Sequence, residues 1–244
     1  MVISSLIYAN EIIMKNGSTT LLPAPLAPPQ TLNDLGHDLE CCALLTPAER
    51  DAITPEIPIK TCQKGTFLLR EGQVVTTCYS IIRGCVREYF LLDGEERTTG
   101  FYTEGDSLSA APSRIQGTPA RQYWECLETT TLTVLTHEKE KDFYRRFPRL
   151  ESLCRIEMEQ KFAAYQAAMA LYINSTPEER YLNLLKTRPD LLDRVPQYQL
   201  ASFIGVKPES LSRIRGRIRA VGRQQRKAPP PLNSTVYHSA TPAM

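Results

Sequence analysis

The chain has 244 residues and a formal net charge of +2, from 29 basic and 27 acidic side chains. At roughly 100 to 200 residues per domain, this length suggests one large domain or two modest ones. Hydrophobic residues make up 42% and charged residues 23% of the chain, which excludes collagen-like, coiled-coil-only and wholly disordered proteins. The near-neutral total argues at first against a nucleic-acid binder, because such proteins carry basic residues that neutralise phosphates.

The sequence contains no run of about 18 apolar residues, so we expect no membrane span and no membrane partner. The N-terminal segment lacks a basic region, and Asn10 and Glu11 interrupt its apolar character, so we expect no signal peptide. Seven cysteines without a disulfide framework indicate reduced thiols and a cytoplasmic protein.

Prolines gather near both ends of the chain, which predicts flexible extensions over residues 1–30 and 223–244. Residues 31–56 have a helical pattern, in which Thr46, Pro47 and Glu49 form the N-cap, first helical position and capping box. Short β-type runs then follow at Phe67–Leu69, Tyr79–Ile82, Val86–Leu92, Thr98–Tyr102 and Leu132–Leu135. Turn pairs separate the runs: Lys64-Gly65, Glu71-Gly72, Arg83-Gly84, Asp93-Gly94 and Gly105-Asp106. This spacing predicts an antiparallel barrel or sandwich.

From Pro148 onward the pattern is helical, and one apolar stripe runs for about six turns. The stripe consists of Leu150, Cys154, Met158, Phe162, Tyr165, Met169 and Tyr172. It fits a helix that packs on its own barrel, and it also fits a helix that meets its twin in a homodimer. We predict a dimerisation helix over residues 148–174. A second capping box, from Thr176 to Glu179, begins the next helix.

The segment 197–214 (QYQLASFIGVKPESLSRI) has the pattern of a helix–turn–helix. Ala201 is the small residue where the helices meet, Gly205 allows the turn, and Pro208 begins the second helix. Five apolar side chains occupy the positions that wedge such helices together: Leu200, Ile204, Val206, Leu211 and Ile214. The alternative is an ordinary helical hairpin.

Positive charge is concentrated in and after this segment. Residues 207–227 contain eight basic side chains and one acid, a local net charge of +7 that leaves −5 for the rest of the chain. Such a concentration on a candidate recognition helix is typical of DNA binding, although a basic tail is the alternative. We therefore assign residues 175–222 to a DNA-binding domain.

Within this domain the second helix is expected to enter the major groove. Arg213 suits guanine and Glu209 suits cytosine, while the hydroxyls of Ser210 and Ser212 suit bases or phosphates. Lys207 also belongs to the predicted interface. Three further basic residues are expected to contact phosphates: Arg215, Arg217 and Arg219.

The order of a glycine-punctuated β-roll, a long helix and a helix–turn–helix resembles the Crp/Fnr family of bacterial transcription regulators. The resemblance covers roughly residues 40–220, and its specific parts are Lys64-Gly65 to Glu71-Gly72, Arg83-Gly84, Glu104-Gly105-Asp106 and Pro208 to Ile214. It implies an α+β fold. An N-terminal antiparallel β-roll of cyclic nucleotide-binding type (a double-stranded β-helix) would span residues 31–147, and a winged-helix-like domain would follow the dimerisation helix.

The resemblance also implies a homodimer that binds a pseudo-palindromic operator, with double-stranded DNA and, for an activator, RNA polymerase as partners. The family reads bases with a Glu and an Arg that match Glu209 and Arg213. A further family Arg falls at Pro208, so the operator is expected to differ from the best-known one.

The ligand-binding pattern departs from the family's cyclic-AMP binders, which hold the ribose with a Glu and the phosphate with an Arg-Ser pair. Ala110 stands at the Glu position and Arg121-Gln122 at the Arg-Ser position. We therefore expect a ligand other than cyclic AMP. Arg121 and Gln122 stay candidates for an effector pocket, because Arg121 can pair with an anion; a surface salt bridge is its alternative role.

Other chemistry has less support in the sequence. Cys41 and Cys42 are adjacent and lack the spacing for an iron–sulfur cluster, whereas Cys62, Cys78, Cys85 and Cys126 are expected to be small buried hydrophobes. Three separated histidines (His37, His137 and His238) provide no metal triad. The sequence contains no catalytic motif, so we do not expect an enzyme. A cupin-like β-roll enzyme is the weaker alternative. A cyclic-nucleotide-binding-like sensor or scaffold that does not bind DNA is the other alternative.

Overall fold

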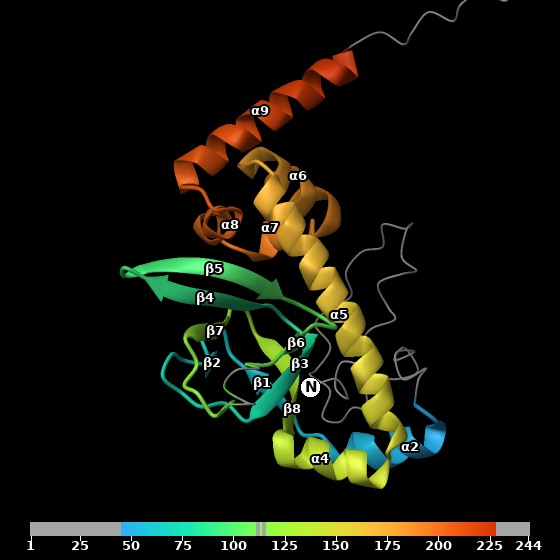
Figure 1. Ribbon diagram of the computed structural model, residues 1–244. Helices are drawn as coiled ribbons and strands as arrows, with labels where there is room; N and C mark the ends of the chain where they lie inside the picture. The colour runs from blue at the N-terminus through green and yellow to red at the C-terminus, as the bar shows by residue number, and fades with distance from the viewer. Residues whose placement is uncertain (1–44, 111–112, 114–115, 228–244) are drawn as a thin grey trace, which may run out of the picture.

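The computed structural model describes residues 45–110, 113 and 116–227, which form a β-roll, a long helix and a small helical domain (Figure 1). The helices α2 (Pro47–Ile53) and η4 (Thr54–Glu56) precede the roll. Its strands are β1 (Ile59–Cys62), β2 (Phe67–Leu69), β3 (Thr77–Arg83), β4 (Val86–Leu92), β5 (Glu95–Tyr102), β6 (Ser107–Leu108), β7 (Gln122–Cys126) and β8 (Thr130–Thr136). They form two four-stranded sheets, in the orders β1-β8-β3-β6 and β2-β7-β4-β5. The pairs are antiparallel, which confirms the predicted β-roll.

The predicted β-type runs all lie in strands, and two of them coincide with β2 and β4. Strands β1, β6 and β7 and helix α4 (His137–Arg146) were not predicted. Strand β1 has two exposed central residues and no alternation of buried and exposed side chains. Helix α4 (HEKEKDFYRR) is mostly charged and has Phe143 as its one buried apolar residue. Both therefore lack the apolar periodicity on which sequence-based prediction depends.

The interior of the roll is filled by side chains from both sheets. Trp124 is 1% exposed and lies edge-on to Tyr79, with ring centroids 6.3 Å apart. The indole nitrogen of Trp124 donates a 2.8 Å hydrogen bond to Glu88. Four cysteines are free and buried, which confirms their predicted place in the core: Cys62, Cys78, Cys85 and Cys126. Cys41 and Cys42 lie outside the described residues.

Five helices follow α4: α5 (Arg149–Asn174), α6 (Pro177–Thr187), α7 (Leu191–Arg194), α8 (Gln197–Ile204) and α9 (Pro208–Lys227). Both predicted capping boxes are present, from Thr46 to Glu49 and from Thr176 to Glu179. The predicted tail begins too early, because α9 continues past residue 222 to Lys227. Residues 223–227 (RQQRK) contain neither glycine nor proline and so do not end a helix. None of the helices in the described ranges is long and apolar enough to cross a membrane.

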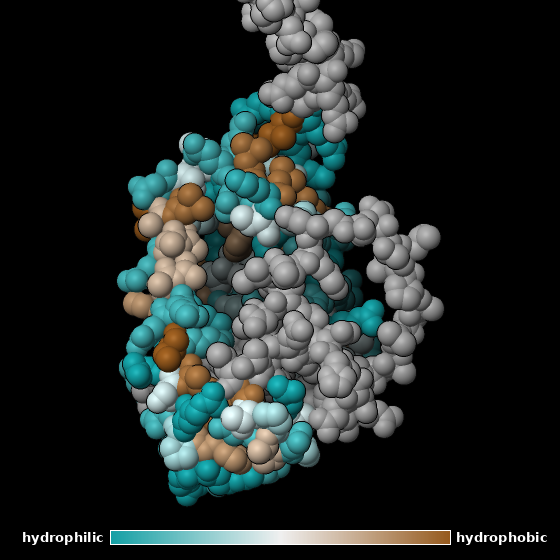
Figure 2. All heavy atoms as spheres, turned by 90° about the vertical axis from the view of Figure 1, so that its right-hand side faces the viewer, coloured by the Kyte–Doolittle hydropathy of each residue, from teal (hydrophilic) through white to brown (hydrophobic). Residues whose placement is uncertain are grey.

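The apolar stripe of α5 divides into two parts. Leu150 and Cys154 are buried in a cluster with residues of α2, β8 and α4, so the first turns pack on the roll. Farther along, the side chains are between 37% and 61% exposed at Met158, Phe162, Tyr165, Met169 and Tyr172. Hydrophobic side chains are visible in patches on the face of the molecule that carries α5 (Figure 2). The helix thus packs on its own roll at its base, while among the described residues most of the rest of the stripe stays exposed.

We expect the substitution Gly84→Ala to destabilise the roll strongly. Gly84 has a φ of +118°, and a Cβ atom there would lie 2.6 Å from the Cα atom of Thr130. The left-handed backbone costs about 1–2 kcal/mol for a residue with a side chain, and overpacking costs about 1–3 kcal/mol more.

Gly94→Ala is the matched control, because Gly94 has a φ of +78° but open space around an added Cβ atom. Urea unfolding should show a larger loss of free energy of unfolding for Gly84→Ala than for Gly94→Ala. Equal losses of unfolding free energy for the two variants would mean that β8, which begins at Thr130, moves aside without a free-energy cost.

Candidate nucleic-acid interface

Helices α8 and α9 form a helix–turn–helix whose turn is set by Gly205. The φ of Gly205 is +82°. Its N–H donates to the carbonyl of Ser202 at 3.1 Å, and the N–H of Val206 donates to the carbonyl of Ala201 at 2.9 Å. This pair of bonds is a Schellman motif, which ends a helix at a left-handed residue. Pro208 then occupies the first position of α9.

The two helices are held at this angle by apolar side chains. At the predicted wedge positions, Leu200, Ala201, Ile204, Leu211 and Ile214 are at most 5% exposed, and Val206 packs against them partly buried. Residues of α6 and α7 complete the cluster with Tyr181, Leu184 and Leu191. The side chains expected to wedge α8 and α9 together therefore do so.

The opposite face of α9 is open to solvent. Lys207, Glu209, Ser212 and Arg213 are exposed, and Ser210 is half-buried. The helix lies at the end of the molecule farthest from α4 and projects away from the β-roll (Figure 1). Because successive residues of a helix turn by about 100°, Glu209 and Arg213 lie on nearly the same side. The predicted base-contacting residues therefore share one accessible surface.

Two predicted phosphate contacts are already engaged within the chain. Arg217 forms an ion pair with Glu178 at 2.8 Å, and Arg215 donates a hydrogen bond to Gln197. Arg213 and Arg217, together with Ser210, also line a shallow hollow between α9 and the beginning of α6. Phosphate binding by Arg215 or Arg217 therefore competes with partners inside the domain, whereas Lys207 and Arg219 are exposed.

Arg121 and Gln122, the candidates for an effector pocket, lie at the beginning of β7. Arg121 is exposed, and Gln122 pairs with Phe90 of β4 in the sheet. Ala110, which stands at the position of the family's ribose-binding Glu, is 2% exposed within the roll's core. Within the described residues no group of three or more His, Cys, Asp or Glu side chains is placed to hold a metal ion.

The helical domain is docked on the roll through α8 and β5. Cys85, Phe101 and Leu127 of the roll belong to the same buried cluster as the core of the helix–turn–helix. Phe101 and Phe203 meet edge-on with ring centroids 5.3 Å apart. The Ser202 hydroxyl accepts from the N–H of Thr98 and donates to the carbonyl of Glu96, both at 3.0 Å. A shared apolar core and the hydrogen bonds of Ser202 therefore join the two domains.

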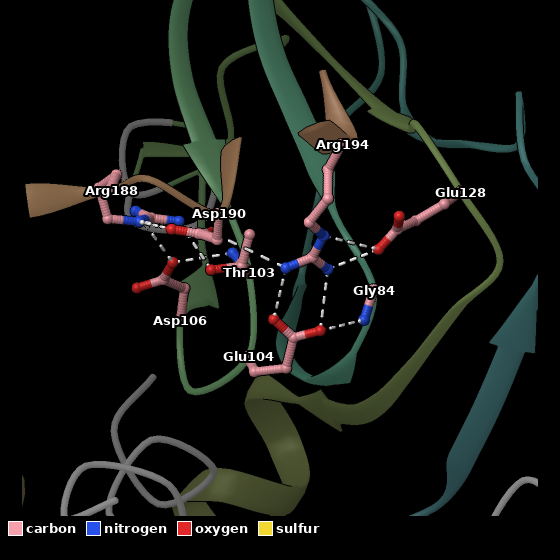
Figure 3. A network of polar contacts seen from close by, with 8 residues as sticks. All are labelled: Gly84, Thr103, Glu104, Asp106, Glu128, Arg188, Asp190 and Arg194. Carbon is pink, nitrogen blue, oxygen red and sulfur yellow. Dashed lines mark hydrogen bonds and ion pairs between the residues drawn. The ribbon is translucent and has the colours of Figure 1, made fainter. Parts of the chain in front are cut away.

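A network of charged residues borders this docking surface (Figure 3). Arg194 at the end of α7 makes two 2.9 Å hydrogen bonds to Glu104 and two, of 3.1 and 2.5 Å, to Glu128. Glu104 also accepts a 2.8 Å hydrogen bond from the N–H of Gly84. Arg188 donates to Thr103 at 2.7 Å. We call the group formed by Arg194, Glu104 and Glu128 the interdomain clasp.

Sequence reasoning missed the clasp. Glu104 was noticed only as part of a turn, and Arg194 follows in the chain 90 residues later. Partial burial tends to raise the pKa of the Glu104 carboxyl, but hydrogen bonds from Arg194 and Gly84 outweigh it and lower the pKa below its usual value of 4.5. The charged form of Glu104 is therefore the one that the folded protein favours.

Comparisons with known proteins agree with this architecture. A family model described as the cyclic nucleotide-binding domain matches residues 59–147, from β1 to the end of α4. The fumarate and nitrate reduction regulatory protein of Vibrio cholerae is 25% identical over 170 residues, which cover 65% of this chain and 67% of that protein.

Two solved structures show the same fold. The c-di-GMP responsive global regulator CLP of Xanthomonas campestris has a TM-score of 0.58 at 16% identity, covering 72% of this chain and 93% of that chain. FixK2 of Bradyrhizobium japonicum has a TM-score of 0.57 at 18% identity, covering 68% of this chain and 86% of that chain.

A cyclic nucleotide-binding type β-roll followed by a long helix and a helix–turn–helix defines a class of two-domain transcription regulators. The family model, the similar regulators and the two structures support a transcription regulator of the Crp/Fnr type. This confirms the resemblance found in the sequence. The expectation that the protein is not an enzyme is confirmed as well, because its relatives are regulators.

We expect Arg194→Ala to destabilise the docked arrangement by about 1–2 kcal/mol, because it removes charge-assisted bonds and the cation between two neighbouring carboxylates. Arg97→Ala is the control, since Arg97 forms an exposed ion pair with Glu95 that is worth about 0–1 kcal/mol. Unfolding in urea measures both effects. A loss for Arg194→Ala no larger than that for Arg97→Ala would contradict a structural role of the clasp.

The effect should depend on pH in a definite direction. Because the folded pKa of Glu104 is lowered, its stabilisation is present above its ordinary pKa of 4.5 and is lost as the pH falls through the folded pKa. The difference between the native protein and Arg194→Ala should therefore shrink in acid.

Proposed function

We propose that this regulator binds a pseudo-palindromic DNA operator as a homodimer and reads it with the exposed face of α9. The observation that carries the proposal is the accessible, basic surface of a helix whose opposite face is packed into a helix–turn–helix core. Such a helix fits the major groove with its N-terminal residues against base edges. Arg213 and Glu209 lie in that part of α9.

The proposed contacts follow from side-chain chemistry. The Arg213 guanidinium can bind O6 and N7 of guanine in a bidentate manner, and the Glu209 carboxylate can accept from N4 of cytosine. Ser210 and Ser212 supply hydroxyls to bases or phosphates. Lys207 and Arg219 bind phosphates directly, while Arg215 and Arg217 do so after release from Gln197 and Glu178.

The exposed stripe of α5 supplies the dimer contact in this proposal. Apolar side chains that stay exposed over several helical turns mark a protein interface, and heptad-like stripes favour helix–helix seams. A two-fold dimer would place its two recognition helices in successive major grooves, about 34–36 Å apart. The operator would then have two half-sites related by the symmetry of the protein.

The roll would act as an effector domain that does not hold cyclic AMP in the family's usual way. Buried Ala110 in place of the ribose-binding Glu supports this proposal, as do Trp124 and Tyr79, which occupy the interior of the roll. Contact with RNA polymerase, if the protein is an activator, and a cytoplasmic location belong to the same proposal.

We expect Arg213→Ala to lose discrimination at one base pair of each half-site, at a cost of about 1–3 kcal/mol. Binding sites selected from a random DNA library supply the target, and fluorescence anisotropy measures the affinity for it and for single-base variants. The control is Arg219→Ala, which should weaken binding to all sequences alike and lower the salt slope by about 1. If Arg213→Ala discriminates as well as the native protein, Arg213 does not read a base.

We expect Phe162→Glu to weaken the dimer at least tenfold, because Phe162 is 60% exposed in the chain and its burial contributes about 1.5–3 kcal/mol. Gln160→Glu is the control, since Gln160 is exposed outside the stripe. Sedimentation equilibrium should give twice the 27.5 kDa chain mass for the native protein and the control. A native mass of 27.5 kDa at micromolar concentration would contradict the dimer.

A further inference from the structure

A cavity of about 190 Å³ lies where the roll, α5 and the DNA-binding domain meet. Phe101 of β5, Leu171 of α5, Leu184 of α6 and Phe203 of α8 supply apolar walls. Arg180 and Arg188 also line it and supply the positive charge. The cavity is therefore an apolar space with cationic groups at its wall, separate from the interior of the roll.

Arg180 is incompletely satisfied in this wall. Its Nε atom is buried and has no hydrogen-bond partner among the described residues. One terminal nitrogen donates to the carbonyl of Tyr172 at 3.1 Å, and the guanidinium lies 4.3 Å from the centre of the Tyr172 ring. A guanidinium has five N–H donors, and only one of those of Arg180 has a hydrogen-bond partner among the described residues, so the side chain keeps donors for an acceptor that enters the cavity.

The neighbouring arginines differ from Arg180 in having carboxylate partners. Arg188 lies near Asp106 and Asp190, and Arg194 is held by the clasp. Among the ion pairs of the described residues, none involves Arg180. The guanidinium of Arg180 thus lies against an aromatic ring and has no carboxylate partner among these ion pairs. A carboxylate on a ligand would bind it through charge-assisted hydrogen bonds.

We propose that this cavity binds a small aromatic carboxylate, with the ring between Phe101, Leu184 and Phe203 and the carboxylate on Arg180. An apolar cavity of about 150 Å³ is large enough for benzene, so the observed volume suits one ring that carries a short acidic group. Phenylacetate and benzoate have this chemistry.

A second copy of the chain is a less suitable occupant. The cavity borders the last turns of α5, and in a two-fold dimer the twin of this segment would approach it. Residues 165–174 (YQAAMALYIN) contain no acid. The partner helix would therefore bring no carboxylate to Arg180, whereas a carboxylate ligand supplies one.

The position of the cavity gives the ligand a means to regulate the protein, and this part of the inference rests on the proposed function in DNA binding. Its walls come from the roll, from α5 and from the domain that carries α9. Arg188 also joins the cavity to the docking surface through Thr103 and Asp106. A bound carboxylate would favour the arrangement of the three parts that encloses it.

Isothermal titration of the full-length protein with phenylacetate and benzoate tests the site directly. We expect one molecule per chain, and at least tenfold weaker binding of benzyl alcohol, which has the ring without the charge. Arg180→Gln should weaken phenylacetate binding at least tenfold. Thr187→Phe should prevent it by filling the cavity from α6, where exposed Thr187 lines the wall.

Lys186→Gln is the matched control, because Lys186 is an exposed cation on α6 that does not line the cavity. It should bind phenylacetate within twofold of the native protein. Circular dichroism and thermal melts identify variants that fail to fold. The proposal is overturned if the native protein binds neither acid at millimolar concentration, or if folded Arg180→Gln binds phenylacetate as well as the native protein does.

A second measurement separates this site from the proposed function. DNA affinity is measured by anisotropy with and without saturating phenylacetate, and we expect a change of threefold or more that Thr187→Phe abolishes. An unchanged affinity overturns the regulatory role. If the native protein binds no DNA, the proposed function fails, while the titration still decides whether the cavity binds the acid.

Discussion

The packing of α8 between β5 and α9 is the contact on which the placement of the DNA-binding surface depends. Phe101 of the roll and Leu200 of α8 belong to one buried cluster that also holds α9. A fully buried side chain of this size contributes about 1.5–3 kcal/mol, whereas a partly exposed ion pair contributes about 1 kcal/mol or less. Apolar burial therefore supplies most of the docking energy, and the clasp of Arg194, Glu104 and Glu128 fixes the orientation at its edge.

Charge distribution complements this arrangement. The chain outside residues 207–227 carries a net charge of −5, and the α9 segment carries +7. Because DNA is a dense line of negative charge, the positive field of the α9 segment attracts it. The nearly neutral total charge thus conceals a strongly polarised molecule.

The sequence was sufficient for features that depend on local chemistry. Capping boxes at Thr46 and Thr176, the Gly205 turn and the wedge positions of α8 and α9 are all set within a few residues of the chain. Strand β1 and helix α4 were not predicted, because partners in β8 and in the α2 region stabilise them more than their own periodicity does.

Features that depend on long-range contacts could not be predicted from the pattern. The sequence around Arg194 is that of a solvated surface residue. Only the docking of the two domains brings Glu104 and Glu128 close to it. The stripe of α5 shows a related limit: its periodicity is uniform from Leu150 to Tyr172, but only its first turns pack on the roll. The hydrophobic periodicity of a helix predicts which of its faces is apolar, but it does not predict which element packs against that face.

Gly205 is important both for the local turn and for the contact of that turn with α5. Its positive φ ends α8 and sets the angle of α9, and a Cβ atom there would lie 2.9 Å from the Tyr172 hydroxyl of α5. Tyr172 in turn lies against the guanidinium of Arg180 on α6. The turn between the two DNA-binding helices therefore rests on the end of the helix proposed to form the dimer. A side chain at position 205 would collide with the Tyr172 hydroxyl, so this glycine lets the turn lie close to the end of α5.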